Sequence, residues 1–242
     1  MITTVLFDLD GTLLPMRQEH FVDTYLGELS KVFAQMGHSP EKAVKALWAG
    51  TAAMMKNDGS TPNSVRFWGA FATVMGVDEG ERAKVEAACD DFYGGAFNNV
   101  KRIVRQSDAP GAAVRALRQK GYTLALATSP LFPPQAVESR LDWVGLKKDD
   151  FALCTDYTNI GFCKNNPGYY AHVLEKLAAK PENCLMVGNS LKEDMCAAKL
   201  GMDTYLVTGY VEMEEGDDIS AFRQGSIEDF ALFASQMPDL RG

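Results

Sequence analysis

Two carboxylates, Asp8 and Asp10, follow closely on an apolar run near the start of the chain. That run, residues 2–7, contains several β-branched residues and predicts a short buried strand. Two acids two residues apart at a strand end point to the same side and repel each other unless a proton or a hard cation such as Mg2+ intervenes. In that arrangement Asp8 could attack an electrophile such as phosphorus, and Asp10 could pass a proton to the leaving group. The alternative is an ordinary strand followed by an Asp-Gly turn at Gly11.

Two later apolar runs end in groups that could hold an anion. Residues 122–127 predict a second strand, and Thr128 follows it. The hydroxyl of Thr128 and the backbone N–H of Ser129 could therefore donate to an anionic oxygen near Asp8. Lys164 follows a third short run, and its ammonium could neutralise both Asp8 and a phosphoryl oxygen. A strand-end threonine is otherwise a turn residue, and most lysines are solvated.

The fourth predicted strand, residues 184–187, is followed by Gly-Asn-Ser and then by two acids. Asp194 lies early on the next predicted helix, where it could complete a metal site directly or through water. Glu193 could add charge to the same site. Acids near a helix N-terminus are also stabilised by the helix dipole, which alone would account for this pair.

The motifs resemble, in sequence order, those of the haloacid dehalogenase (HAD) superfamily of phosphohydrolases. They are Asp-x-Asp-Gly-Thr at the first strand, Thr at the second, Lys after the third and Gly-Asn-Ser-x-x-x-Asp at the fourth. By this resemblance Asp8 is the nucleophile that forms an aspartyl-phosphate, and Asp10 is the general acid and then the base. The phosphoryl group is held by Thr128 and Lys164, with Ser129 as a further contact. Mg2+ is bound by Asp8, the main-chain carbonyl of Asp10, Asn189 and Asp194.

Two positions depart from the family pattern. Asn189 stands where many relatives have aspartate, so one metal-ligating charge is missing, although an amide oxygen can still bind Mg2+. Asn165 replaces the first proline of a Lys-Pro-x-Pro motif, while Pro167 is kept. This second change affects the rigidity of the loop rather than the role of Lys164.

Asp10 also bears on which reaction the resemblance implies. Dehalogenases of this type generally lack an acid at that place, so the resemblance favours hydrolysis of small phosphorylated metabolites. A phosphosugar mutase keeps the same acids and is an alternative. A non-catalytic binding protein that kept the fold is another, because fold alone does not fix function.

The remaining elements predict an α/β fold with a Rossmann-like parallel sheet core and an inserted α-helical cap domain. Over residues 16–104 the apolar residues recur with helical spacing, which predicts four helices. After Pro110, helices and strands alternate and give five strands in all. We expect a core domain at residues 1–15 and 105–242 and a cap domain at 16–104. The aromatic and methionine side chains of the insertion are interpreted as the core of a helical bundle rather than a ligand site.

Composition limits the partners. The 242 residues carry a net charge of -8, with a pI near 5.0, which argues against a nucleic-acid surface. The chain has no signal-peptide pattern and no apolar run of about 18 residues, so we expect a soluble, cytoplasmic protein without a membrane partner. The five cysteines suit buried thiols of a reducing compartment. The substrate and the oligomeric state stay open. Four cap cations could contact a substrate, although surface charge is their commoner role: Arg17, Lys56, Arg66 and Lys101.

Overall fold

The computed structural model describes all residues from 1 to 242 and contains one six-stranded sheet in the order β3-β2-β1-β4-β5-β6, with every neighbouring pair parallel. The strands are β1 (Thr4–Phe7), β2 (Thr123–Leu126), β3 (Leu153–Cys154), β4 (Cys184–Gly188), β5 (Asp203–Val207) and β6 (Gln224–Gly225). The predicted α/β class with a parallel sheet is confirmed. The edge strand β6 was not predicted, because its two residues provide no apolar run to detect.

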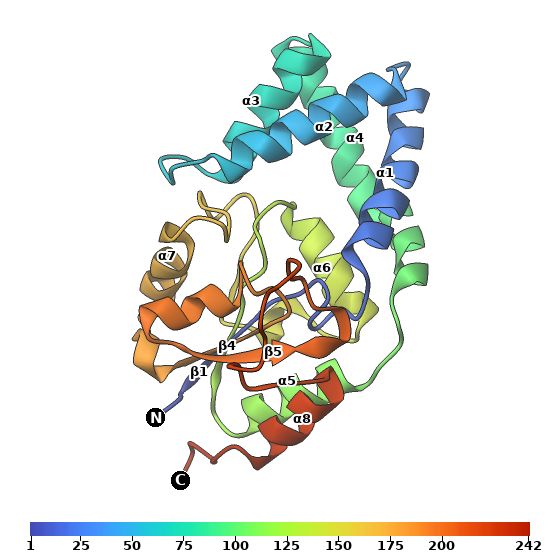
Figure 1. Cartoon of the computed structure of the whole chain (residues 1–242). Helices are drawn as coiled ribbons and strands as arrows, with labels where there is room; N and C mark the ends of the chain where they lie inside the picture. The colour runs from blue at the N-terminus through green and yellow to red at the C-terminus, as the bar shows by residue number, and fades with distance from the viewer.

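Helices cover both faces of the sheet (Figure 1). They are α5 (Ala109–Gln119), α6 (Pro134–Trp143) and α8 (Ile227–Gln236) on one face, and α7 (Gly168–Leu177) with the 3-10 helix η4 (Met195–Leu200) on the other. Successive side chains of a strand point to opposite faces of the sheet. Val5 and Phe7 therefore pack on the face covered by α5, α6 and α8, and Leu6 packs on the face covered by α7 and η4. The helix that was predicted to begin near Asp194 is thus a tighter 3-10 helix.

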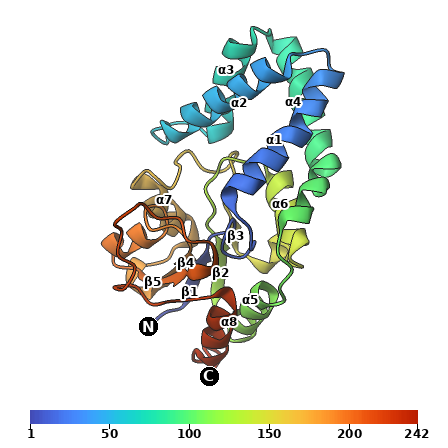
Figure 2. The ribbon, with the colours of Figure 1, turned by 45° about the vertical axis from the view of Figure 1, so that its right-hand side comes forward.

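The inserted helices stand together beyond one end of the core (Figures 1 and 2). They are α1 (Gln18–Gln35), α2 (Pro40–Met55), α3 (Asn63–Met75), α4 (Glu79–Gly94) and the 3-10 helix η1 (Ala96–Ile103). At the start of α2, the Ser39 hydroxyl accepts a hydrogen bond of 3.3 Å from the N–H of Lys42, and Pro40 occupies the first turn. None of the helices has the length and apolar character needed to span a membrane.

Hydrogen bonds join the cap to the core at several places, two of which lie where the chain crosses between them and at the start of α3. Where the chain enters and leaves the insertion, the N–H of Arg105 donates to the carbonyl of Pro15 at 2.9 Å. At the start of α3, Asn63 donates its side-chain amide to the carbonyl of Pro130 at 3.0 Å and its backbone N–H to Ile160 at 3.1 Å. The predicted boundaries at residues 15 and 105 fall at the first of these contacts, and the division into two domains stays a prediction.

Candidate active site

The register of the three central strands brings the motifs to one edge of the sheet. Phe7, the last residue of β1, pairs with Leu126 of β2 and with Val187 of β4. The N–H of Asp8 continues the ladder by donating to Val187 at 2.8 Å. Residues that follow the ends of these strands therefore lie next to one another, at the edge where open α/β sheets bind ligands.

Lys164 lies between two carboxylates. Its Nζ is 2.6 Å from Oδ1 of Asp8 and 2.7 Å from Oδ1 of Asp194. The other oxygen of Asp194 accepts a hydrogen bond of 2.9 Å from the N–H of Ser190. The side chain of Lys164 is only 1% exposed, so these charges interact through protein rather than through water. Three residues from three predicted motifs thus meet in one buried ionic cluster.

Burial and charge shift the protonation of this cluster. Burial raises the pKa of Asp8 to about 8, although the neighbouring Lys164 acts in the opposite direction. Burial also opposes the charged form of Lys164, but Asp194 and Asp8 outweigh it and hold the lysine pKa well above its usual value. An ionised Asp8, which a nucleophile requires, therefore depends on positive charge brought close to it.

Two glycines and the amide of one asparagine allow the motif after β1 and the motif after β4 to lie close together. Gly11 has φ of 80°, and a Cβ there would collide with the amide of Asn189. Gly188 likewise leaves no room for a Cβ, because the Asp194 carboxylate lies against it. Asn189 is buried, accepts from the Thr12 hydroxyl at 3.2 Å and donates to the carbonyl of Tyr210 at 2.6 Å. Its amide therefore links the first motif to the loop after β5, whatever else it binds.

Thr128 follows the second strand, as the sequence predicts, and is 2% exposed. Its carbonyl accepts hydrogen bonds from the hydroxyls of Thr155 at 2.6 Å and Tyr169 at 2.9 Å, which fixes the backbone there. Neither the Thr128 hydroxyl nor the N–H of Ser129 is paired with another protein group. Both groups are therefore available to an anionic ligand.

Asp10 is held by a residue that the sequence did not indicate. Arg140 of α6 is completely buried, and its Nη1 donates to Oδ2 of Asp10 at 2.5 Å. Its Nε donates to the carbonyl of Ala136 at 3.1 Å, and its guanidinium carbon lies 4.4 Å from the ring centre of Phe132. Oδ1 of Asp10 is buried without a partner. Arg140 therefore occupies one oxygen of Asp10 and leaves the other free.

The donor set fits a water-rich Mg2+ site rather than a cage of side chains. No group of three or more acidic, histidine or cysteine side chains gathers to hold a metal ion. Oδ2 of Asp8 and the main-chain carbonyl of Asp10 accept no hydrogen bond. Mg2+ typically keeps several waters and takes only one or two carboxylates, so one carboxylate oxygen with one carbonyl oxygen matches its preference. Asn189 and Asp194 lie close by, but their side-chain oxygens already accept hydrogen bonds, so their ligation stays a prediction.

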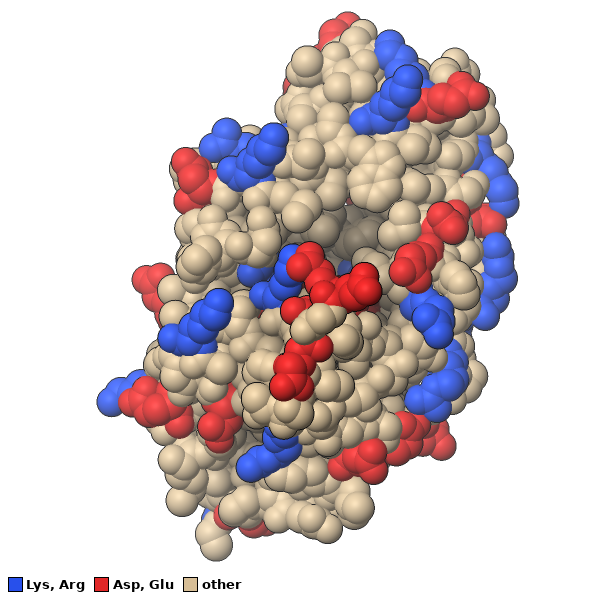
Figure 3. Space-filling view, viewed as in Figure 1, with Lys and Arg blue, Asp and Glu red and all other residues tan.

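An acid from the C-terminal tail reaches the mouth of the site. Glu212 lines a cleft of about 350 Å³ together with Asp10 and Asn189, and its N–H donates to the Asn189 carbonyl at 2.9 Å. Partial burial, reinforced by neighbouring acids, raises the pKa of Glu212 to about 7. Figure 3 shows the hollow between the cap and the core, with acidic side chains on its core side. The acidic segment that follows β5 therefore borders the site at this residue.

Comparison with known proteins agrees with this geometry. The model of the haloacid dehalogenase-like hydrolase family matches residues 2–201. The chain is a haloacid dehalogenase-like hydrolase. None of the curated proteins compared with it matches.

Solved structures share the fold of this HAD-like hydrolase over nearly its whole length. A HAD phosphatase from Thermococcus onnurineus is 19% identical, with a TM-score of 0.59 and 99% of this chain and 100% of the other covered. A 2-haloacid dehalogenase from Pseudomonas syringae pv. Tomato is 20% identical, with a TM-score of 0.64 and coverages of 96% and 99%. CbbY from Rhodobacter sphaeroides, solved in complex with phosphate, is 16% identical, with a TM-score of 0.60 and coverages of 98% and 100%. Phosphatases and dehalogenases both occur among these neighbours, so the likeness establishes the fold and leaves the reaction to the site.

Proposed function

We propose that this HAD-like hydrolase is a Mg2+-dependent phosphatase of small phosphorylated metabolites that acts through an aspartyl-phosphate on Asp8. The observation that carries the proposal is the Asp10 carboxylate, whose Oδ1 is buried and unpaired beside the nucleophile's strand end. An alkoxide leaving group is strongly basic and needs a proton, whereas a halide is weakly basic and leaves without one. A free carboxyl oxygen at this place therefore favours cleavage of a phosphate ester over cleavage of a carbon–halogen bond.

The proposed reaction has two steps. An oxygen of Asp8 attacks phosphorus, the ester P–O bond breaks, and Asp10 gives its proton to the departing alcohol oxygen. A water molecule then attacks the phosphorus of the aspartyl-phosphate and gives a proton to Asp10. The bond between phosphorus and Asp8 breaks, which restores the carboxylate and releases inorganic phosphate.

The other groups supply charge and orientation. Lys164 is within hydrogen-bond distance of Asp8 and can also reach phosphoryl oxygens bound to it, which reduces the repulsion between two anions. The Thr128 hydroxyl and the Ser129 N–H are the proposed donors to the phosphoryl group. Mg2+ would be held by the Asp8 carboxylate and the main-chain carbonyl of Asp10, with Asn189 and Asp194 completing the surroundings. When bound, the metal would neutralise charge on the phosphoryl oxygens.

The decisive experiment measures release of inorganic phosphate from an aryl phosphate, with and without Mg2+, by the wild type and by Asp8→Asn. We expect Mg2+-dependent release that is abolished in Asp8→Asn. The matched control is Asp149→Asn, because Asp149 is an exposed acid of the core outside the site, and it should retain wild-type activity. Phosphate release that survives Asp8→Asn would exclude the assigned nucleophile.

Product analysis separates the other reactions. Formation of an isomerised sugar phosphate instead of inorganic phosphate would support a phosphosugar mutase. Halide release from 2-haloacids without phosphatase activity would support a dehalogenase. Absence of both activities, with Mg2+ and phosphate still bound, would support a non-catalytic protein.

A further inference from the structure

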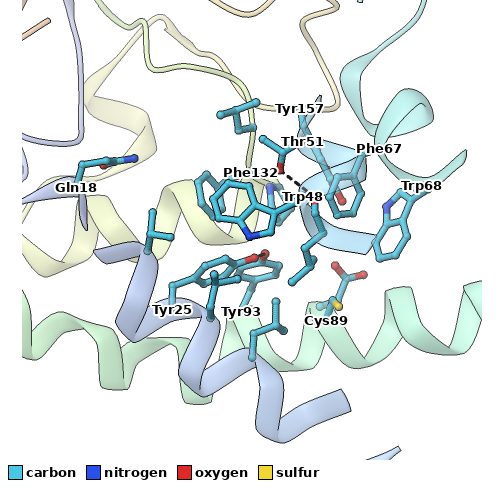
Figure 4. Close-up of a pocket in the computed structure, with 17 residues that line it drawn as sticks. Gln18, Tyr25, Trp48, Thr51, Phe67, Trp68, Cys89, Tyr93, Phe132 and Tyr157 are labelled. Carbon is cyan, nitrogen blue, oxygen red and sulfur yellow. Dashed lines mark hydrogen bonds between the residues drawn. The ribbon is translucent and has the colours of Figure 1, made fainter. Parts of the chain in front are cut away.

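The cap helices do not close completely over one another. A cavity of about 140 Å³ opens between them and the core, and 13 of its 17 lining residues are hydrophobic. Figure 4 shows the rings of Tyr25, Trp48, Tyr93 and Phe132 around this space. Trp48 is 51% exposed, although burying an indole is strongly favourable. The aromatic side chains predicted to form only a bundle core therefore also form the wall of an open cavity.

This cavity adjoins the active site. Gln18 lines both the cavity and the cleft that contains Asp10. On the core side the cavity wall is formed by the segment that follows Thr128 and Ser129, including Phe132, whose ring lies 4.4 Å from the guanidinium carbon of Arg140. A group attached to a phosphoryl oxygen near Asp8 could therefore extend into the cavity.

The chemistry of the wall disfavours anionic occupants. No lysine or arginine lines the cavity, and its one charged residue is the acid Asp90. The hydroxyls of Tyr25 and Tyr93 are hydrogen-bonded to each other at 2.7 Å, and that of Thr51 donates to the Leu47 carbonyl at 3.0 Å. A second phosphate would find no cation here, and a charged group buried without a partner is costly.

The size suits one ring, because an apolar cavity of about 150 Å³ accommodates benzene. We propose that this cavity is the leaving-group site, and that the substrate is a monophosphate ester of an uncharged alcohol carrying an aromatic or similarly bulky apolar group. This inference rests on the proposed phosphatase function. It departs from the bisphosphate seen in one structural neighbour, CbbY from Rhodobacter sphaeroides in complex with xylulose-1,5-bisphosphate.

The first test measures binding, which does not require turnover. Calorimetry with Mg2+ present compares benzylphosphonate with methylphosphonate, since neither has an ester bond to hydrolyse and they differ only by the ring. We expect benzylphosphonate to bind roughly tenfold or more tightly to the wild type. In Trp48→Ala that preference should fall below about threefold. Val65→Ala is the matched control, because Val65 is an exposed apolar cap residue that does not line the cavity, and it should keep the preference.

The second test measures kcat/KM for benzyl phosphate and for glycerol phosphate. Wild type should favour benzyl phosphate, and Trp48→Ala should lose that advantage mainly through KM. Equal affinities for the two phosphonates in the wild type, or a preference that survives in Trp48→Ala, would overturn the inference and leave the phosphatase proposal intact. If no ester releases phosphate, the proposed function fails instead, and the phosphonate comparison still decides whether the cavity takes a ring.

Discussion

Replacing Arg140 with methionine is expected to destabilise the folded protein by about 3–5 kcal/mol, because the change removes the one cation paired with a poorly hydrated carboxylate. The Arg140 side chain is fully buried, and that of Asp10 is only 16% exposed. Methionine restores much of the hydrocarbon volume, so the loss reports chiefly the ion pair and the contact with the Phe132 ring. Arg140→Lys keeps the charge and should cost less.

A double-mutant cycle isolates the pair. In Asp10→Asn with Arg140→Met neither charge remains, so the double variant should be at least as stable as Arg140→Met alone. The coupling energy should be about 1–3 kcal/mol, in the upper part of the range of roughly 0.5–3 kcal/mol found for residues in contact. Urea unfolding of the four proteins, followed by circular dichroism in EDTA, gives the required free energies.

Two results would refute this reasoning. One is a cost below about 1 kcal/mol for Arg140→Met, which is the range of exposed ion pairs. The other is additivity of the two single variants within about 0.5 kcal/mol. Kinetics add an independent readout, because a residue that only orients Asp10 should change kcat in Arg140→Lys while KM stays near the wild-type value.

Three further predictions follow from the same site. Because burial raises the pKa of Asp8 to about 8, the folded metal-free protein binds a proton on the Asp8 carboxyl group more tightly than the unfolded chain does. Its stability should therefore fall as pH rises from about 5 to 8, and urea unfolding of Asp8→Asn in EDTA should show a smaller fall. Asn189→Asp should tighten Mg2+ binding in calorimetry yet lower stability by about 1–3 kcal/mol, because the donor to the Tyr210 carbonyl is lost; unchanged stability would contradict this. Gly11→Ala should cost about 1–3 kcal/mol in thermal unfolding, since φ is 80° and a Cβ meets Asn189; a wild-type melting temperature would show that the turn relaxes freely.

The approach of Asp8 and Lys164 could be predicted from the sequence because the ends of buried strands can be located from the pattern of apolar residues. An apolar run ends where its first polar residue begins, and the carboxyl ends of parallel strands share one edge. Side chains 156 residues apart were therefore expected to meet, and they lie 2.6 Å apart. The short strand β6 gives no such signal, and its place at the sheet edge is decided by tertiary contacts alone.

Arg140 was missed because charged residues are assumed to be exposed. A signal was nevertheless present, since Arg140 lies three residues after Val137 and directly before Leu141, on the apolar face of a predicted helix. A cation at such a position needs a buried anion as its partner. The sequence could have indicated that Arg140 needs a buried acidic partner, but only the packing of α6 against the first motif identifies that partner as Asp10.

The cavity beside Trp48 marks a different limit of sequence reasoning. Helical periodicity tells which side chains face inward, and it does so correctly for the buried residues Phe33 and Phe71. It does not tell whether the inward faces of neighbouring helices meet, because that depends on crossing angles and connections. A helix with aromatic residues along one face therefore has the same sequence pattern in a closed bundle as in a bundle that leaves room for a ligand.

The formal charges of the site explain why a divalent cation belongs in it. Three carboxylates, Asp8, Asp10 and Asp194, face two cations, Lys164 and Arg140, which leaves one excess negative charge. A phosphate ester dianion would raise this excess to three in a largely buried place, and Mg2+ would return it to one. Both cations are already paired with carboxylates of the site, so without a metal most of the added charge would stay uncompensated. Burial is the main cause of the raised pKa of Asp8, and the charges of Asp194 and Asp10 act in the same direction, so in the metal-free protein a proton is the simplest positive charge that the cluster can take up.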